Sequence, residues 1–502
     1  MNNIKPFVHV LKSPYSHYVY DVNTDSVLKI SEELYDYLLD LEHGLCPDNT
    51  DCLNREINEL NNNGYLKTFH PKGILDPRLL QLEYLLNNRI EGITLQVTQK
   101  CNMRCSYCSF TYDNVNSRTH TSKSMDYGTA IKAIDFYFHH SRDSKLINVS
   151  FYGGEPLLEY EMIKKLIEYV YQRFEGKEIS FNVTTNAILL TPERLKFLVN
   201  NNVNVMVSID GPADIHNKSR KLAGTGKGSY DLIVKQLEQL KKKCPEEYNQ
   251  LTFNSVIDSL NDITELTDFY NHDIFQNSLE KWKEDTSLNA IGGDFSINTP
   301  VMETPEGTSA VASECFYISE RASGLIAMYS LIGIAEKKYI NPIALNIEAS
   351  LISENNSLVP TVQLDEYSPK GGPCIPGVHG TFIRIDGEFF PCEKASDTSK
   401  ALNIGNIDIG YDFEKIKEML NIGKLTEKKC VNCWAIRHCS SCVIHGNMMN
   451  KISRDMLFEK CPSIQSHLEA SLQDLIALDE LRPILLKHYS IDAKEVSRCE
   501  KY

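Results

Sequence analysis

The stretch Gln99-Lys-Cys-Asn-Met-Arg-Cys-Ser-Tyr-Cys-Ser-Phe110 decides how the rest of the chain is interpreted. It places Cys101, Cys105 and Cys108 in a C-x3-C-x2-C loop, directly after residues 93–98, whose alternating apolar side chains are typical of a half-buried strand. Three thiolates in one short loop can hold three corners of a four-iron cluster, whereas a ferredoxin supplies a fourth cysteine. The residues alone also permit a zinc loop or three unrelated thiols, although zinc sites usually contain paired C-x2-C elements.

Two further features make this region resemble the radical S-adenosylmethionine superfamily. Tyr107 stands where that family has an aromatic residue beside the adenine. The stretch 151–156 reads Phe-Tyr-Gly-Gly-Glu-Pro and resembles the family's GGEP motif. The resemblance implies a four-iron cluster on the three cysteines, with S-adenosylmethionine bound at the open iron. Gly153 and Gly154 would let backbone approach this cofactor, and Glu155 would lie near its cationic amino group.

Residues 91–300 alternate expected strands with expected helices, which indicates parallel strands joined by crossover helices. The strands are expected at 93–98, 146–151, 179–185, 203–209, 251–257 and 293–298, and the helices near 126–140, 158–174, 192–201, 229–243 and 262–271. Six such units resemble the partial (β/α)6 barrel of the radical enzymes, so the expected fold class is α/β. Barrels of this kind bind their cofactors at the carboxyl ends of the strands.

Polar residues follow several of these expected strands. By resemblance, Thr185, Asn186, Ser208 and Asp210 contribute contacts to the ribose and methionine portions of the cofactor. Arg220 is expected to clamp the methionine carboxylate, because a guanidinium matches carboxylate geometry. Ser208 and Asp210 also fit ordinary turn chemistry before a helix.

Residues 1–70 predict a small separate unit, and residues 71–90 a linker. Strands are expected at 7–11, 17–21 and 27–30, followed by a helix capped by Ser31 and by a second apolar stripe through Leu53, Ile57 and Leu60. This winged-helix-like pattern resembles the recognition elements of enzymes that modify ribosomally made peptides (RiPPs). In that family, a leader peptide adds a strand to the exposed sheet edge. A cap over one end of the barrel is the alternative.

A second field of cysteines lies in residues 371–502, after a segment at 301–370 that is expected to form bridging helices. The spacing resembles the SPASM domain, here with a C-terminal helix, although Cys439 and Cys442 are separated by two residues instead of three. The resemblance implies an outer auxiliary cluster on Cys430, Cys433, Cys439 and Cys461, and an inner one on Cys374, Cys392 and Cys442. Spacing alone also permits a four-cysteine zinc site.

The inner cluster would lack a fourth ligand. Sulfatase-maturing relatives have a further cysteine soon after the first one, but residues 375–380 contain none. Either His379 fills this position, or the iron stays open for a substrate thiolate; His379 also fits an ordinary loop. Those relatives carry an aspartate base directly after the second cysteine, where this chain has Glu393, a candidate catalytic carboxylate.

Composition excludes several classes of protein. A chain of 502 residues predicts two to four domains. A net charge of −15 disfavours nucleic-acid binding and favours a basic peptide partner. No apolar run approaches about 18 residues, which predicts no spanning helix and no membrane partner. Fifteen cysteines without a signal peptide predict metal ligands in a cytoplasmic protein.

These features predict a radical S-adenosylmethionine oxidoreductase of the sactipeptide or ranthipeptide type. It would join cysteine sulfur to carbon in a leader-bearing precursor peptide. Its cofactors would be S-adenosylmethionine and three 4Fe-4S clusters, reduced by a donor such as flavodoxin or ferredoxin. Formylglycine formation in a sulfatase and carbon–carbon or carbon–oxygen cross-linking are alternative activities. A non-catalytic iron–sulfur carrier is a further alternative, but it would have no use for Glu155, Ser208 and Arg220.

Overall fold

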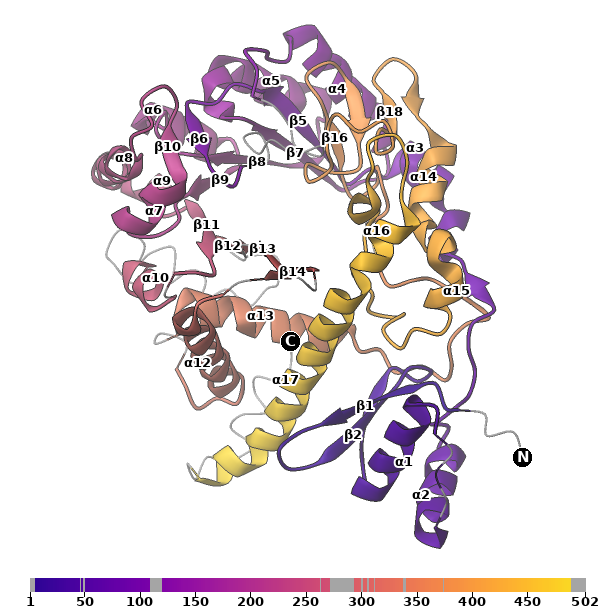
Figure 1. The fold of residues 1–502 in the computed structure, drawn as a ribbon. Coiled ribbons are helices and arrows are strands. Elements are labelled where there is room, and N and C mark those ends of the chain that lie inside the picture. The colour runs from indigo at the N-terminus through magenta and orange to yellow at the C-terminus, as the bar shows by residue number, and fades with distance from the viewer. Residues whose placement is uncertain are drawn as a thin grey trace.

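The computed structural model describes residues 5–488, apart from residues 46, 48–49, 109–119, 262, 271–292, 299–300, 305–306, 311, 337–339 and 373. Figure 1 shows a curved α/β layer at the top left, the C-terminal cysteine-bearing region on its right, and a small N-terminal unit below. A long helix crosses the centre toward that unit.

The N-terminal unit is a three-stranded antiparallel sheet with two helices. Its elements are β1 (Val8–Lys12), β2 (His17–Asp21), β3 (Ser26–Ile30), α1 (Glu32–Glu42) and α2 (Asp51–Asn62). The hydroxyl of Ser31 caps α1 by accepting a hydrogen bond from the Leu34 backbone N–H at 3.1 Å. The elements lie within about two residues of their expected positions because period-2 and period-3.6 patterns are local properties of the sequence.

The segment after this unit differs from the expected linker. It contains β4 (Gly73–Ile74), the short 3-10 helix η1 (Pro77–Leu80) and α3 (Leu82–Asn88). Leu82 and Leu86 are four residues apart, so they share one helix face, and both are buried in the main hydrophobic core. The segment is therefore part of the body of the molecule.

Six parallel strands form the curved layer, in the order β12-β11-β9-β8-β7-β5. Their bounds are β5 (Gly92–Thr98), β7 (Leu146–Gly153), β8 (Glu178–Thr185), β9 (Val203–Ser208), β11 (Thr252–Asp258) and β12 (Gly293–Asn298). The helices on the outer side (Figure 1) are α4 (Tyr127–His140), α5 (Tyr160–Arg173), α6 (Pro192–Asn200), α7 (Ala213–Ser219), α8 (Tyr230–Lys243), α9 (Pro245–Tyr248) and α10 (Ile263–Tyr270). Strands and helices alternate as expected.

The C-terminal region continues this sheet, which the sequence did not predict. Strand β16 (Thr381–Ile383) pairs in parallel with β5, and β17 (Glu388–Phe390), β18 (Gly405–Asn406) and β19 (Gly410–Tyr411) follow, giving ten strands in all. Residues 384–387 form the turn between β16 and β17. Gly387 has φ +86° and donates to the Arg384 carbonyl at 2.9 Å, as in a type I turn closed by a glycine bulge.

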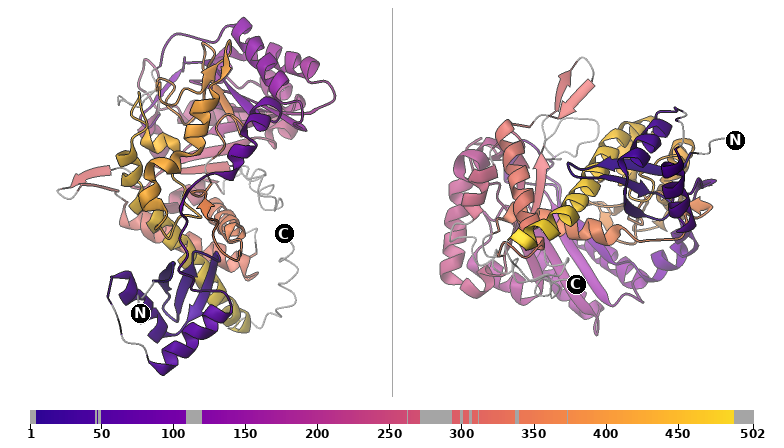
Figure 2. Two further views of the ribbon diagram at one scale, coloured as in Figure 1. Left: turned by 90° about the vertical axis from the view of Figure 1, so that its right-hand side faces the viewer. Right: turned by 90° about the horizontal axis from the view of Figure 1, so that it is seen from below.

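Helices and one hairpin connect these parts. They are β13 (Val301–Thr304), β14 (Gly307–Ala310), α12 (Glu314–Leu331), α13 (Pro342–Ser357), β15 (Tyr367–Ser368), α14 (Phe413–Leu420), α15 (Glu427–Cys430), α16 (Arg454–Glu459) and α17 (Cys461–His488). Figure 2 shows the β13–β14 hairpin projecting from the body. In the described part of the chain, no helix is sufficiently long and apolar to cross a membrane.

Candidate functional site

The loop after β5 brings its three cysteines together. Cys105 ends the short strand β6 (Met103–Cys105), which pairs with β10 (Arg220–Leu222) in a separate two-stranded sheet and so fixes the loop against the segment that follows α7. Burial raises the pKa of Cys101 to about 12 and that of Cys105 to about 11, and the neighbouring Cys108 contributes to both shifts. These mutual effects show that the three free thiols share one site. Their sulfur donors suit iron, whose binding displaces the thiol protons.

The two glycines of the GGEP stretch hold the backbone against this loop. The backbone N–H of Gly154 donates to the Thr98 carbonyl at 2.9 Å, and that of Glu155 donates to the Lys100 carbonyl at 2.8 Å. A Cβ atom on Gly153 would lie 2.0 Å from the Thr98 oxygen, and one on Gly154 would lie 2.1 Å from the Lys100 oxygen. Close packing of two chain segments therefore requires these glycines, whether or not they also approach a cofactor.

Replacing Gly154 with alanine is expected to lower stability by about 1–3 kcal/mol, because its Cβ would meet rigid backbone. Thermal unfolding of the purified protein measures this loss. Gly324→Ala is the matched control, since no atom lies within 4 Å of a Cβ at that position. Equal unfolding temperatures for the two variants would contradict the packing explanation.

Glu155 is buried at the centre of this arrangement and is 1% exposed. Its carboxylate accepts hydrogen bonds from the Thr185 hydroxyl at 2.7 Å, the Asn186 backbone at 2.8 Å and the Leu157 backbone at 3.0 Å. Burial raises its pKa, against the lowering effect of these donors. The structure thus joins three predicted cofactor residues, Glu155, Thr185 and Asn186, in one network beside Cys101.

Arg220 is already paired within the protein. Its Nε lies 2.9 Å from Oδ2 of Asp210, and both side chains are buried. Asp210 also accepts hydrogen bonds from the Tyr107 hydroxyl at 2.6 Å and from the Val256 backbone at 3.1 Å. Burial by itself would lower the pKa of Arg220. The nearby Asp210 and Tyr107 have a larger, opposite effect, so the pKa of Arg220 is raised. Asp210 therefore balances the charge of Arg220, whose role as a clamp for the cofactor carboxylate stays a prediction. Ser208, also predicted as a contact, lies buried at the end of β9.

Two residues that the sequence analysis did not select complete this network. Asn102, inside the cysteine loop, accepts a hydrogen bond from the Asn186 side chain at 2.7 Å. His216 is buried, and its Nδ1 accepts from the Asp210 backbone N–H at 3.3 Å. Burial lowers the pKa of His216 to about 4, so the ring is neutral. In the sequence, the only sign that His216 belongs to this network is its position one helical turn before Arg220.

The four C-terminal cysteines that the resemblance assigns to an outer cluster are neighbours; their role as its ligands stays a prediction. Burial raises the pKa of Cys433, and the nearby Cys430 and Cys461 raise it further. Burial likewise raises the pKa of Cys439, to which Cys430 and Cys433 add. The side chain of Gln465 donates to the Cys433 sulfur at 3.3 Å. Hydrogen bonds to sulfur of this kind tune iron–sulfur clusters, so the donor set fits one.

The three cysteines assigned to the inner cluster differ in their surroundings. Burial raises the pKa of Cys392, and the negative charges of Glu393 and Cys442 raise it further. These three residues are therefore neighbours. Cys374 is exposed and lies near Arg78. His379 is also exposed, and its Nδ1 accepts a hydrogen bond from the Ile375 backbone at 2.7 Å. Nδ1 is thereby occupied, which leaves only Nε2 of His379 for the predicted ligand role.

Among the residues that the structure describes, no three or more His, Cys, Asp or Glu side chains are close enough to hold one metal ion.

Two relatives show what this chain is similar to in sequence. Over 195 residues the chain is 30% identical to the radical SAM cyclopropyl synthase TigE of Paramaledivibacter caminithermalis. This alignment covers 37% of this chain and 38% of that protein. It is also 30% identical over 158 residues to a cysteine-type anaerobic sulfatase-maturating enzyme of Clostridium novyi. That alignment covers 31% of this chain and 41% of the enzyme. The chain thus spans about two fifths of the length of these relatives.

A solved structure described as native anSMEcpe with bound AdoMet aligns with 75% of this chain and 99% of its own, at 18% identity and a TM-score of 0.48. The Radical SAM superfamily profile matches residues 95–265, which include the cysteine loop, the GGEP stretch, Asp210 and Arg220. The chain therefore contains a radical SAM domain.

Proposed function

We propose that this protein is a radical SAM peptide maturase that installs thioether cross-links in a cysteine-containing precursor peptide. The observation that carries this proposal is that Cys392, which has Cys442 as a neighbour, directly follows β17 in a sheet continuous with β5, the strand that leads into the cysteine loop. Asp397, five residues after Cys392, accepts a hydrogen bond from Gln96 of β5 at 2.8 Å. The two cysteine regions are thus linked through one sheet.

Thioether formation breaks one S–H and one C–H bond, forms one C–S bond and removes two hydrogens from the peptide. When bound, S-adenosylmethionine on a reduced four-iron cluster would supply the radical that takes the hydrogen atom from carbon; the thiol would lose its proton to solvent or a base, and auxiliary clusters would provide an acceptor for the remaining electron. Cys101, Cys105 and Cys108 would hold the first cluster, with Glu155 facing the cofactor. Cys374, Cys392 and Cys442 would hold the inner one, with an open position for the substrate sulfur.

The N-terminal sheet supplies a place for a leader peptide. Its β1–β2 hairpin is held by α17, because the hydroxyls of Ser13 and Tyr18 each donate to Glu480 at 2.8 Å. Strand β3 is at the other edge, and no described strand pairs with its outer side. An extended peptide would pair there through its backbone.

The region around the outer cysteines fits an acidic electron donor such as flavodoxin or ferredoxin. Residues 424–460 contain seven Lys or Arg and three Asp or Glu, a local net charge of +4, whereas the whole chain carries −15. Lys428, Lys429 and Lys460 are exposed beside Cys430 and Cys461. Complementary charge would steer an acidic protein to this surface.

Formylglycine formation is the second candidate. It is favoured by the position of Glu393 beside Cys392, where a carboxylate could act as a base. In thioether formation the substrate thiol is consumed in a bond to carbon of the same peptide. In formylglycine formation it is replaced by an aldehyde, and no cross-link forms. The two reactions are therefore distinguishable in the product.

Mass spectrometry of a cysteine-containing precursor, after anaerobic incubation with reduced enzyme and S-adenosylmethionine, tests the proposal. We expect a loss of two hydrogens per modified cysteine, with the affected thiols resistant to alkylation and no disulfide present. The same precursor without its leader is the matched control and is expected to react far more slowly. Loss of two hydrogens with every thiol still alkylated would contradict the assignment to sulfur.

A further inference from the structure

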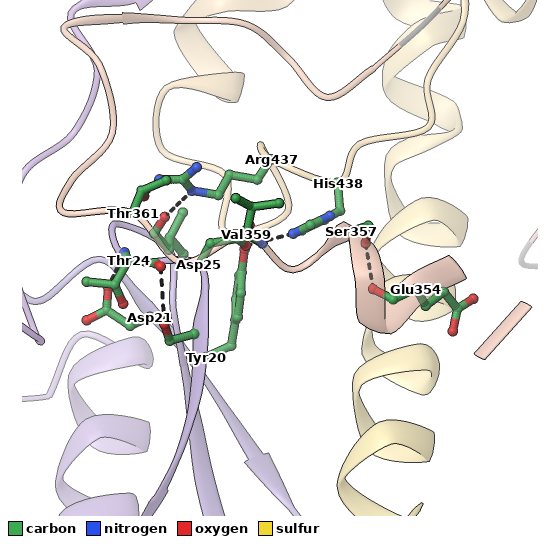
Figure 3. Close-up of polar contacts among 12 residues, drawn as sticks. Tyr20, Asp21, Thr24, Asp25, Glu354, Ser357, Val359, Thr361, Arg437 and His438 are labelled. Carbon is green, nitrogen blue, oxygen red and sulfur yellow. Dashed lines mark hydrogen bonds and ion pairs between the residues drawn. The ribbon is translucent and has the colours of Figure 1, made fainter. Parts of the chain in front are cut away.

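One loop of the C-terminal region, residues 434–438, contacts the N-terminal unit through several side chains, two of which are labelled in Figure 3. The Arg437 guanidinium donates to the Val22 carbonyl at 2.6 Å, and to the Asn23 carbonyl and the Thr361 hydroxyl at 2.7 Å each. Backbone carbonyls at a turn have fixed directions, so the two bonds to Val22 and Asn23 orient the turn between β2 and β3 against the loop.

Asp25, in the same turn, forms the second part of this contact. Nε2 of His438 lies 2.7 Å from Oδ1 of Asp25, which also accepts a hydrogen bond from the Tyr20 hydroxyl at 2.7 Å. The Val359 backbone donates to the other carboxylate oxygen at 3.0 Å. Asp25 is 4% exposed and has φ +55°, so its contacts hold a residue in an uncommon backbone conformation.

Aromatic packing forms the third part. The indole of Trp434 stacks on the imidazole of His9 in β1, with ring centroids 3.9 Å apart and an angle of 6° between the planes. Ile436 is buried in a core that it shares with Tyr20 and Val22. Trp434 and Ile436 therefore pack against the N-terminal unit beside the polar contacts of Arg437 and His438.

The loop is bounded at both ends by candidate ligands of the outer cluster, Cys433 and Cys439. One side of it packs tightly against Gly371, where a Cβ atom would lie 2.4 Å from the Arg437 carbonyl and 2.5 Å from the Cys439 nitrogen. On another side, a cavity of about 990 Å³ is lined by Arg437, His438 and Cys439 together with α13 and α17. Packing alone thus supports the loop incompletely.

We propose that residues 434–438 are the docking site of the N-terminal unit and that the outer cluster, by fixing Cys433 and Cys439, holds this site in its docking conformation. Loading of the cluster would then position the peptide-recognition unit. A metal bridge that closes a short loop removes conformational freedom from it, whereas loss of the bridge frees both ends. This inference rests on the proposed function only in assigning a cluster to the outer cysteines.

Hydrogen exchange of the full-length, anaerobically reconstituted protein tests the proposal. Cys439→Ala is expected to speed exchange by at least about tenfold in peptides that cover residues 17–30 and 434–438. Cys101→Ala is the matched control: it removes a ligand of a different cluster and is expected to leave both regions protected. Unchanged exchange in Cys439→Ala, with iron lost, would overturn the coupling.

Iron content separates this outcome from failure of the proposed function. If Cys439→Ala retains all the iron of the natural protein, the outer cluster is wrongly assigned, and the coupling falls with it. Arg437→Ala examines docking alone, because it removes three hydrogen bonds but no ligand. It is expected to speed exchange in residues 17–30 at unchanged iron content, and full protection there would overturn the docking assignment.

Discussion

Cys105→Ala is expected to reduce formation of deoxyadenosine from S-adenosylmethionine to background. Cys105 ends β6, and its sulfur lies among Cys108, Arg220 and Asp210, so no neighbouring thiol can replace it without moving the β6–β10 pair. A cluster with two protein ligands is not held, and the cofactor then has no iron to bind. Chromatography of the products after reduction with dithionite measures this effect.

Cys315→Ala is the control for this variant, since Cys315 is an exposed free thiol on α12. It should keep both the iron content and the rate of cofactor cleavage of the natural protein. Cofactor cleavage at the natural rate in Cys105→Ala would show that the loop after β5 does not hold the cluster.

Asp210→Ala is expected to destabilise the radical SAM domain by about 3–5 kcal/mol, because it leaves the buried guanidinium of Arg220 without its partner. The hydroxyl of Tyr107 and the backbone N–H of Val256 lose their acceptor in the same variant. The shift of the urea unfolding midpoint measures the loss.

A double variant and a surface variant serve as controls. Asp210→Ala with Arg220→Met removes the unpaired charge and is expected to recover part of the lost stability. Glu414→Ala breaks an exposed ion pair with Lys417 and should leave the midpoint nearly unchanged. Equal shifts for Asp210→Ala and Glu414→Ala would contradict the importance of the buried pair.

The sequence predicted features that depend on neighbouring residues in the chain. The strands and helices of the parallel layer follow from local periodicity, and the cysteine loop follows from its spacing. Glu155 was found because it lies in a short motif. Thr185 and Asn186 were named by resemblance, as cofactor contacts at the end of an expected strand, and the structure adds that both donate to Glu155.

Features that depend on distant segments were not predicted. The clash of a Cβ at Gly154 with Lys100, the pairing of Arg220 with Asp210, and the pairing of β16 with β5 all join residues whose proximity only the fold creates. Residues 71–90 were expected as a linker because their pattern is short, yet Leu82 and Leu86 enter the main core. The docking loop was missed because Arg437 and His438 resemble ordinary loop residues between two cysteines.

The pairing of β16 with β5 has a consequence for synthesis of the chain. In the finished protein β16 covers the edge of β5, but residues 381–383 leave the ribosome long after residues 92–98. At about 5–20 residues per second, this edge stays uncovered for roughly 15 to 60 s. An uncovered strand edge pairs readily with other chains. Expression with a chaperone is therefore expected to raise the soluble yield by protecting β5 until its neighbour arrives.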